Sequence, residues 1–210
     1  YGGAPAPALV QLGELALYEK RYRDATKLIR RALRFNPDDA LALTSLAVAL
    51  RLDGRIAEAS KTVHQALGQM PLLPFALAEQ WRISGARRSG RAVGEETRPA
   101  WTRSLTPGAQ TYLEVAVWYR SLGDLSSSDA VIQAALKQLP AEDISPLVHY
   151  YLASNARLAG RVQEAVEHAG KAASTPCDKV FPHRIEDALV LREALRHGPL
   201  DARPGLAETN

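Results

Sequence analysis

Small and apolar residues recur every three or four positions along most of this chain, which is the spacing of one face of an α-helix. In the first such segment they are Leu12, Gly13, Ala16, Ala25, Leu28, Ile29 and Ala32. Short breaks at Lys20–Arg21 and Asp53–Gly54 divide two such segments into halves, and Pro37 and Pro71 close them. Glycine relieves the left-handed backbone at a helix end and proline cannot continue a helix, so the pattern predicts helical hairpins.

The hairpin pattern repeats with a period of 34 residues. The residues related by this period are Gly13 and Ala47, Ala25 and Ala59, Ala32 and Ala66, and Pro37 and Pro71. Similar stretches follow at Gly123 to Pro140 and at Gly160 to Pro176, and Ser128 lies almost two periods beyond Ala59. A fixed period of this length is typical of stacked supersecondary units, so one further unit is expected between the second and the later ones.

The register predicts the positions of the helices. We expect helices near residues 6–19, 22–35, 39–52, 55–69, 74–86, 109–122, 125–139, 144–159, 162–174 and 184–197. Small residues where the two helices of a hairpin cross are expected to be nearly fully buried, and these are Ala47, Ala59, Ala116 and Ala165. The pattern is lost in residues 87–104, which are rich in Arg and Gly, and we expect the least regular part of the chain there.

The residues at fixed places of each unit resemble the tetratricopeptide repeat family. In the first hairpin they are Leu9, Leu12-Gly13, Tyr22, Ala25, Ile29, Ala32 and Pro37. In the second hairpin they are Leu43, Leu46-Ala47, Gly54, Ala59, Val63, Ala66 and Pro71. Two later units match in the same way, from Tyr112 to Pro140 and from Leu152 to Pro176. A helical bundle with accidental periodicity is the alternative.

The resemblance implies an all-α fold, an α-solenoid of about five hairpins with a C-terminal capping helix. The expected repeats cover about residues 6–39, 40–73, a degenerate 74–108, 109–145 and 146–180, with the cap at 184–197. Together they predict one superhelical array over 1–197, followed by a flexible tail at 198–210. The predicted cap, or first half of a sixth hairpin, carries one apolar stripe made of Ile185, Ala188, Leu189 and Leu195.

A second resemblance covers roughly the second half of the chain. The runs AQTYLEVAVWYRSLGD, SPLVHYYLA and VFPHRIEDALVLREAL are similar to the repeat region of large bacterial proteins. Those proteins carry an uncharacterised, carbohydrate-related domain ahead of a tetratricopeptide array. The chain begins Tyr-Gly-Gly without Met, so we expect it to be a piece of a longer protein. This resemblance assigns no activity to the residues present.

Composition agrees with closely packed helices. The chain of 210 residues is 46% hydrophobic but only 6% aromatic, which favours Ala- and Leu-rich helix packing over a β-sandwich. The single cysteine, Cys177, excludes an internal disulfide framework and fits a reducing compartment. The longest nearly uncharged run, Ala40 to Leu50, is too short to span a bilayer, and no signal-peptide pattern begins the chain. We therefore expect a cytoplasmic protein without membrane contact; the composition does not predict an oligomeric state.

The motifs of common catalytic chemistry are missing from the sequence. The five histidines, at 64, 149, 168, 183 and 197, show no HExxH pattern and no cysteine at zinc-ligand spacing. No Gly-rich phosphate-binding motif is present, and Cys177 has a candidate base, His183, near it only in sequence. We predict no catalytic residue, no metal ligand and no cofactor, and therefore no enzyme within this segment.

The predicted binding surface is the concave face of the solenoid. By the family resemblance, the fifth, ninth and twelfth places of each repeat line the groove, and spacings of four and three put them on one helical face. In the second, fourth and fifth repeats these are Thr44, Val48, Arg51, Leu113, Val117, Arg120, Tyr150, Ser154 and Arg157. An Arg recurs at the twelfth place, which predicts an anionic, partly apolar peptide partner. Glu14 and Val48 at the ninth places argue against the carboxylate clamp with which family members grip chaperone tails.

A simpler interpretation of these arginines stays open. They lie near the C-terminal ends of their helices, where the helix dipole favours a cation by about 0.3–1 kcal/mol. If their side chains are bound to neighbouring carboxylates, they are not available to an anionic partner.

A cluster of arginines suggests one further alternative. Six arginines between Arg82 and Arg103 face only Glu95 and Glu96, a local net charge of +4 in a chain whose total is +3. Trp81 and Trp101 flank the cluster, and arginines with aromatic residues bind single-stranded nucleic acid in other proteins. The charge is not spread along a face, so a solvated loop is favoured.

We predict a noncatalytic protein–protein interaction scaffold. The alternatives are an accessory repeat module of a larger carbohydrate-active enzyme and, with less support, a nucleic-acid-binding solenoid.

Overall fold

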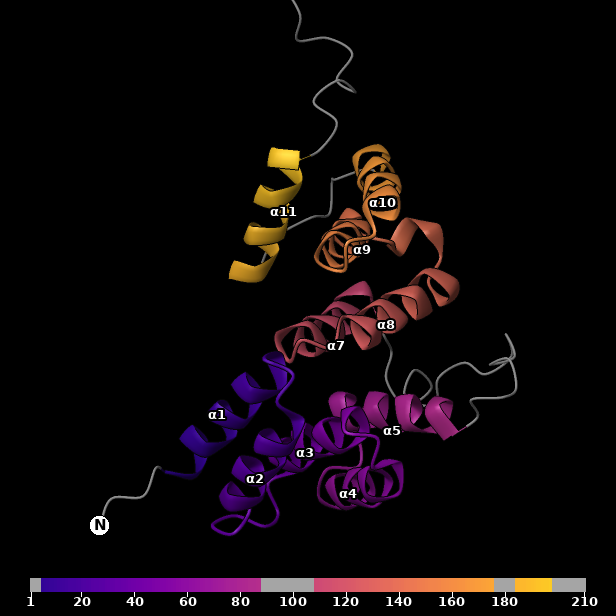
Figure 1. The fold of residues 1–210 in the computed structure, drawn as a ribbon. Helices are drawn as coiled ribbons and strands as arrows, with labels where there is room; N and C mark the ends of the chain where they lie inside the picture. Colours follow the sequence, from indigo (N-terminus) through magenta and orange to yellow (C-terminus); the bar gives the residue numbers. More distant parts are fainter. Residues whose placement is uncertain (1–4, 88–107, 176–183, 198–210) are drawn as a thin grey trace, which may run out of the picture. The chain divides into compact units, whose positions relative to one another are not determined.

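The computed structural model describes residues 5–87, 108–175 and 184–197, and every regular element in these ranges is a helix (Figure 1). The α-helices are α1 (Ala6–Tyr18), α2 (Tyr22–Ala32), α3 (Ala40–Leu52), α4 (Ile56–Gln69), α5 (Pro74–Arg87), α7 (Ala109–Ser121), α8 (Leu125–Gln138), α9 (Pro146–Leu158), α10 (Val162–Ser174) and α11 (Ile185–His197). A short 3-10 helix, η1 (Ala141–Asp143), precedes α9. The predicted all-α helical repeat is confirmed.

Three of the hairpins that the register predicts are present. Helix α1 packs against α2, α3 against α4, and α9 against α10, and each second helix of the first two hairpins also packs against the next helix along the chain. The chain divides into two compact units, one up to Ala134 and one from Ala135 onward. Each unit is described by itself below, and the single array over 1–197 stays a prediction.

Local signals set the helix ends. Asp39 caps α3 by accepting hydrogen bonds from the backbone N–H groups of Leu41 and Ala42, and Ser145 caps α9 through Leu147. Helix α2 ends at Ala32, a few residues earlier than expected, because a turn precedes Pro37. The small residues predicted at the helix crossings, Ala47, Ala59, Ala116 and Ala165, are all buried.

The turn inside each hairpin uses one left-handed residue. Gly54, Gly123 and Gly160 have φ angles of 79°, 75° and 75°, and Lys20 occupies the same place in the first hairpin with φ of 61°. A side chain at this conformation costs about 1–2 kcal/mol, which explains why glycine recurs here. The first hairpin keeps the turn with a non-glycine residue.

Several predictions fall outside the described residues. They concern the irregular segment from residue 88 to 104, Cys177, His183 and the tail at 198–210.

Candidate functional site

Arg51, the twelfth-place residue of the second repeat, lies at the centre of a buried polar cluster. Its side chain is 9% exposed. Nε lies 2.7 Å from Glu79 Oε1 and Nη2 lies 3.0 Å from Glu79 Oε2, so the guanidinium binds this carboxylate with both arms. Nη2 also lies 2.7 Å from Asp124 Oδ2. Two carboxylates of the chain therefore hold Arg51 in this structure, and its contact with an anionic partner stays a prediction.

The partners of Arg51 are themselves fully engaged. Glu79 accepts a hydrogen bond from the Tyr119 hydroxyl at 2.9 Å, and Asp124 accepts from the Ser127 backbone N–H at 3.0 Å and the Ser127 hydroxyl at 2.6 Å. We call Arg51, Glu79, Tyr119, Asp124 and Ser127 the Arg51 cluster. It connects α3, α5, α7 and α8 within the first unit, so its position marks it as a structural centre.

Burial and neighbouring charges shift the pKa values of the two carboxylates in opposite directions. Burial raises the pKa of Glu79, and Arg51 and Tyr119 only partly offset that effect. Burial alone would also raise the pKa of Asp124, but Arg51 and Ser127 outweigh it and hold this pKa below its usual value. Burial further raises the pKa of the Tyr119 hydroxyl. The cluster contains two carboxylates and one cation, and the more deeply buried carboxylate is the easier one to protonate.

Four more of the predicted groove residues have almost no exposed surface. Val48 and Leu113 are buried, and the buried Thr44 donates its hydroxyl to the Ala40 carbonyl at 2.6 Å. Ser154 is buried and donates to the Glu193 carboxylate. These four side chains are buried in this conformation, and their contact with a partner stays a prediction.

The other four predicted residues keep part of their surface. Val117 and Arg120 on α7 are half-buried, as are Tyr150 and Arg157 on α9. Arg157 is 33% exposed, and its Nε lies 3.6 Å from Glu193 Oε1, beyond good hydrogen-bonding distance. Contact of these residues with a partner stays a prediction.

Polar links between successive first helices were missed by the sequence analysis. The Ser45 hydroxyl of α3 donates to Glu14 of α1 at 2.7 Å, and burial raises the pKa of Glu14. Arg51 bonds to Glu79 of α5, and Arg157 faces Glu193 of α11. Arg51 and Arg157 therefore each pair with a carboxylate on a helix later in the chain, which neither a groove nor the helix dipole requires. A single Glu in the apolar stretch FALAEQW of α5 was the available signal.

The capping helix α11 packs with a different face from the one expected. Ile185, Leu189 and Leu195 are exposed, while Asp187 and Val190 are buried. The reason is polar: the Tyr151 hydroxyl of α9 donates to Asp187 at 2.6 Å, and Ser154 and Arg157 engage Glu193. These bonds turn the acidic face of α11 toward α9, so the predicted apolar stripe, with Ala188, faces outward.

The described histidines form no metal centre. His149 of α9 and His168 of α10 lie with their Nδ1 atoms 3.3 Å apart, and burial together with His168 and Lys171 lowers the pKa of His149. Across the described ranges, no group of three or more His, Cys, Asp or Glu side chains is placed to hold a metal ion. His64 is exposed, and its Nδ1 lies 2.6 Å from the Ser60 carbonyl.

None of the helices in the described parts of the chain is both long enough and apolar enough to cross a bilayer.

Helical hairpins in a 34-residue register, with small buried residues at fixed places, define this chain as an all-α helical-repeat protein. No protein-family model matches the chain, and no curated protein matches it. Among solved structures it is similar to TTC0263, "a thermophilic TPR protein" of Thermus thermophilus, with 22% identity, coverage of 91% of this chain and 99% of that one, and a TM-score of 0.48.

Two further solved structures are similar to the chain. One is MamA from Desulfovibrio magneticus RS-1, with 16% identity, coverage of 82% of this chain and 96% of that one, and a TM-score of 0.44. The other is PilW, a type IV pilus biogenesis factor, with 20% identity, coverage of 93% and 88%, and a TM-score of 0.43. At these values the similarities assign no function to this chain.

Proposed function

We propose that this chain is a noncatalytic scaffold for protein–protein interactions that binds an anionic, partly apolar peptide segment along α9. The observation that carries the proposal is the partly exposed pair of Tyr150 and Arg157. They lie seven residues apart, which is two helical turns, so both are on one face of α9. An aromatic ring and a guanidinium on one face suit a peptide with an apolar side chain and a carboxylate.

Arg157 is suited to exchange its partner. Its contact with Glu193 is long and partly exposed to solvent, whereas Arg51 is enclosed by two short contacts. An incoming carboxylate gains two parallel hydrogen bonds from the guanidinium and displaces one weak ion pair. An exposed ion pair contributes only about 0–1 kcal/mol, so a useful affinity needs several contacts, including the Tyr150 ring.

The groups with shifted pKa values support the noncatalytic part of the proposal. Such groups often mark active sites. Here Glu79, Tyr119 and Asp124 are buried and hydrogen-bonded within the same cluster, so a substrate does not reach them. Their pKa shifts follow from a structural role.

No observation on the described residues supports the nucleic-acid alternative. Arg82 is the arginine of the Arg82–Arg103 segment whose side-chain bonds are described, and it donates to the Ser127 and Ser126 hydroxyls at 3.0 and 3.3 Å. Its guanidinium is therefore partly used within the first unit.

The test is selection of peptides from a random display library on the folded chain, followed by affinity measurement on a selected peptide. We expect the selected peptides to be rich in Asp and Glu beside apolar residues, and Arg157→Glu to weaken binding at least tenfold. Arg55→Glu is the matched control, because Arg55 has a similarly exposed side chain, paired with Glu58 of α4. Equal loss with both variants, or no acidic preference, would contradict the proposal.

A further inference from the structure

The hairpin of α9 and α10 has two histidines at places where three other hairpins of the register have none. His149 lies four residues before Ala153 of α9, and His168 lies three residues after Ala165 of α10. The same two places carry Leu9 and Leu28, Leu43 and Thr62, and Tyr112 and Val131. The first residue of each of these pairs is buried. In the α9–α10 hairpin a core position is therefore occupied by two groups that take up protons near neutral pH.

The two imidazole rings are in direct contact across the hairpin, and we call them the histidine pair. Their Nδ1 atoms lie 3.3 Å apart, and the rings are stacked with 5.4 Å between their centroids and 25° between their planes. His168 is buried and His149 is half-buried. The pair therefore joins the first turn of α9 to the middle of α10.

The contact accommodates one proton between the rings but not one on each. With a single Nδ1–H between them, one ring donates a long hydrogen bond and the other accepts it. When both rings are protonated, both Nδ1 atoms carry hydrogen and neither accepts. Two cations then face each other in a partly buried place, where solvent screens their repulsion poorly. Burial, repulsion and the lost hydrogen bond all oppose the second proton.

Neighbouring charges on α10 act in the same direction. Burial, His168 and the cation of Lys171 together lower the pKa of His149. The acids of α10 are bonded locally, Glu164 to Arg161 and Glu167 to Gln163. The neighbouring charge that acts on His149 is therefore positive.

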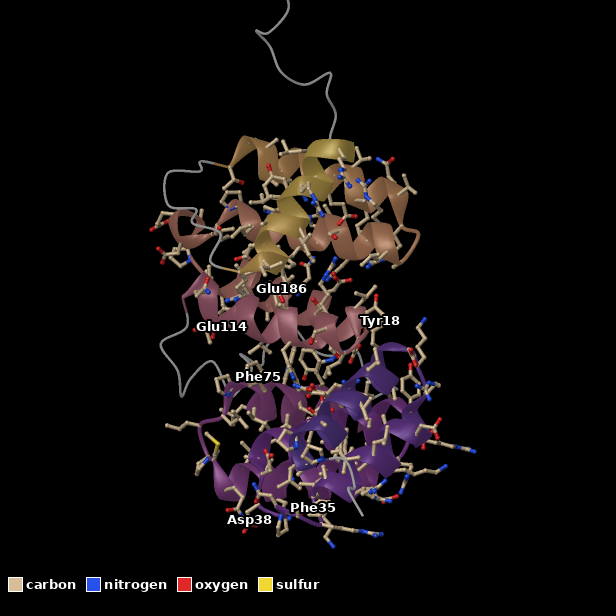
Figure 2. All side chains as sticks on the ribbon, turned by 90° about the vertical axis from the view of Figure 1, so that its left-hand side faces the viewer. Tyr18, Phe35, Asp38, Phe75, Glu114 and Glu186 are labelled. Atoms are coloured by element: carbon tan, nitrogen blue, oxygen red, sulfur yellow. The ribbon has the colours of Figure 1, made fainter. Side chains whose placement is uncertain are left out.

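The acids of α11 are used on another face of α9. Figure 1 shows α10 and α11 packed on different sides of α9. Asp187 accepts from the hydroxyl of Tyr151, which lies two residues from His149 and so about 200° around the helix. Glu193 engages Ser154 and Arg157, and Arg157 lies about 12 Å further along α9 than His149. Glu186 of α11, labelled in Figure 2, and the acids of η1 are exposed.

His168 is the largest buried side chain of α10. The other buried residues of this helix are alanines, at 165, 169 and 172. An alanine buries little apolar area and contributes little to holding two helices together. A change in the charge of His168 therefore affects a large part of the surface by which α10 packs on α9.

We infer that the histidine pair is a pH switch within the α9–α10 hairpin, which joins the two helices while it carries at most one proton and separates them when acid adds the second. The unfolded chain takes up both protons as the pH falls through about 6.5, whereas the folded hairpin takes up the second at a lower pH. The stability of the hairpin is therefore unchanged above about pH 6.5 and decreases as the pH falls from there to the lowered folded-state pKa of His149. The switch needs no partner, so it goes beyond the peptide site proposed on α9.

The test measures amide hydrogen exchange of the full chain at about pH 7.5 and about pH 5.5, with rates corrected for the intrinsic pH dependence of exchange. One missing proton changes the opening equilibrium by up to about tenfold over the first pH unit below 6.5. We expect the protection of α9 and α10 to fall by about three- to tenfold in acid, and α3 and α4 to lose none. The measurement is made without peptide, so failure of the proposed peptide site leaves its result as it is.

Two variants remove the second proton in different ways. The double variant His149→Leu/His168→Val gives this hairpin apolar residues like those at the same places of other hairpins. His168→Gln keeps a side chain that can bond to His149 but takes up no proton. We expect both variants to abolish the loss of protection in acid. His168→Gln should also raise the pH at which His149 titrates in NMR spectra, because His168 is one of the groups that lower its pKa.

The matched control is His64→Gln, which removes an exposed histidine of α4 and should keep the wild-type response to acid. Protection of α9 and α10 that stays unchanged in acid, or that falls equally in α3 and α4, overturns the inference. A response to acid that survives in both variants of the histidine pair also overturns it. Zinc ions at neutral pH should leave exchange unchanged, and zinc-dependent protection that His168→Gln abolishes would make the pair a metal site instead of a switch.

Discussion

Arg51 and Arg157 occupy the same place in their repeats but lie in opposite environments. Arg51, in the first unit, is almost enclosed and held by two carboxylates at 2.7 Å. Arg157, in the second unit, is one-third exposed and faces one carboxylate at 3.6 Å. Burial makes the first pair structural, because removing one partner strands a charge away from water. Exposure leaves the second pair weaker, so one residue type at one register place has two different environments.

The largest expected effect comes from breaking the buried side of this comparison. Arg51→Ala leaves Glu79 and Asp124 buried without their cation, and we expect the free energy of unfolding to fall by about 3–5 kcal/mol. Urea denaturation followed by circular dichroism measures the change. Arg55→Ala, which removes an exposed pair, is the control and should have no measurable effect. A loss for Arg51→Ala as small as that of the control would show that the cluster is not structural.

Packing at the helix crossings in the first unit is the next largest effect. Ala59 is fully buried where α4 crosses α3, so Ala59→Leu should cost about 1–3 kcal/mol by overpacking. The melting temperature measures it. Exchange of the exposed Ala188 for Leu on α11 is the control, since that position has room and should keep the wild-type melting temperature.

Acid should weaken the Arg51 cluster through Asp124. Its pKa is held below the usual value near 3.8, so its stabilisation is complete above about pH 4 and is lost as the pH falls through the folded-state pKa. Asp124→Asn should therefore be less stable at neutral pH and show a flatter decline of unfolding free energy in acid, measured by urea titrations at several pH values.

Glu79 should act in the opposite direction. The pKa of Glu79 is raised, so the folded protein protonates this carboxylate at a higher pH than the unfolded chain does. The contribution of Glu79 to stability therefore decreases as the pH rises from the unfolded-state pKa to the folded-state pKa. Glu79→Gln should remove this part of the pH dependence. Identical pH profiles for the wild type and both cluster variants would contradict the assignment.

Arg157→Ala should have the smallest effect on stability. The pair with Glu193 is long and partly solvated, so we expect a loss of about 0–1 kcal/mol, which added salt reduces further. Urea denaturation at low and high salt measures it. A loss as large as that of Arg51→Ala would show that burial does not explain the difference between the two arginines.

The 34-residue register was sufficient to predict the helices of the fold. Local chemistry, such as the Asp39 cap and the Gly54 turn, fixes the helix ends, and small residues such as Ala59 fix the helix crossings. Both kinds of signal can be read from the sequence. The site was not predictable in the same way. Which carboxylate meets Arg51 depends on contacts across 28 and 73 residues, and no periodicity specifies them.

Helix α11 shows why hydrophobicity alone was insufficient. Its most apolar stripe was expected to pack inward, yet the Tyr151 and Ser154 hydroxyls of α9 need acceptors once they are buried. Asp187 and Glu193 supply them, and the helix turns accordingly. The orientation follows from polar groups on a different helix, which a pattern confined to α11 does not contain.

The bond between Arg51 and Asp124 has a consequence for how the protein folds. Repeat arrays usually contact only their nearest neighbours, so segments can form and open one at a time. A buried ion pair that closes a span of 73 residues prevents this in the first unit, because α3 and the turn before α8 must be in place together. The first unit should therefore open as one cooperative block, while α11, joined to α9 largely through polar contacts, exchanges its amide hydrogens sooner.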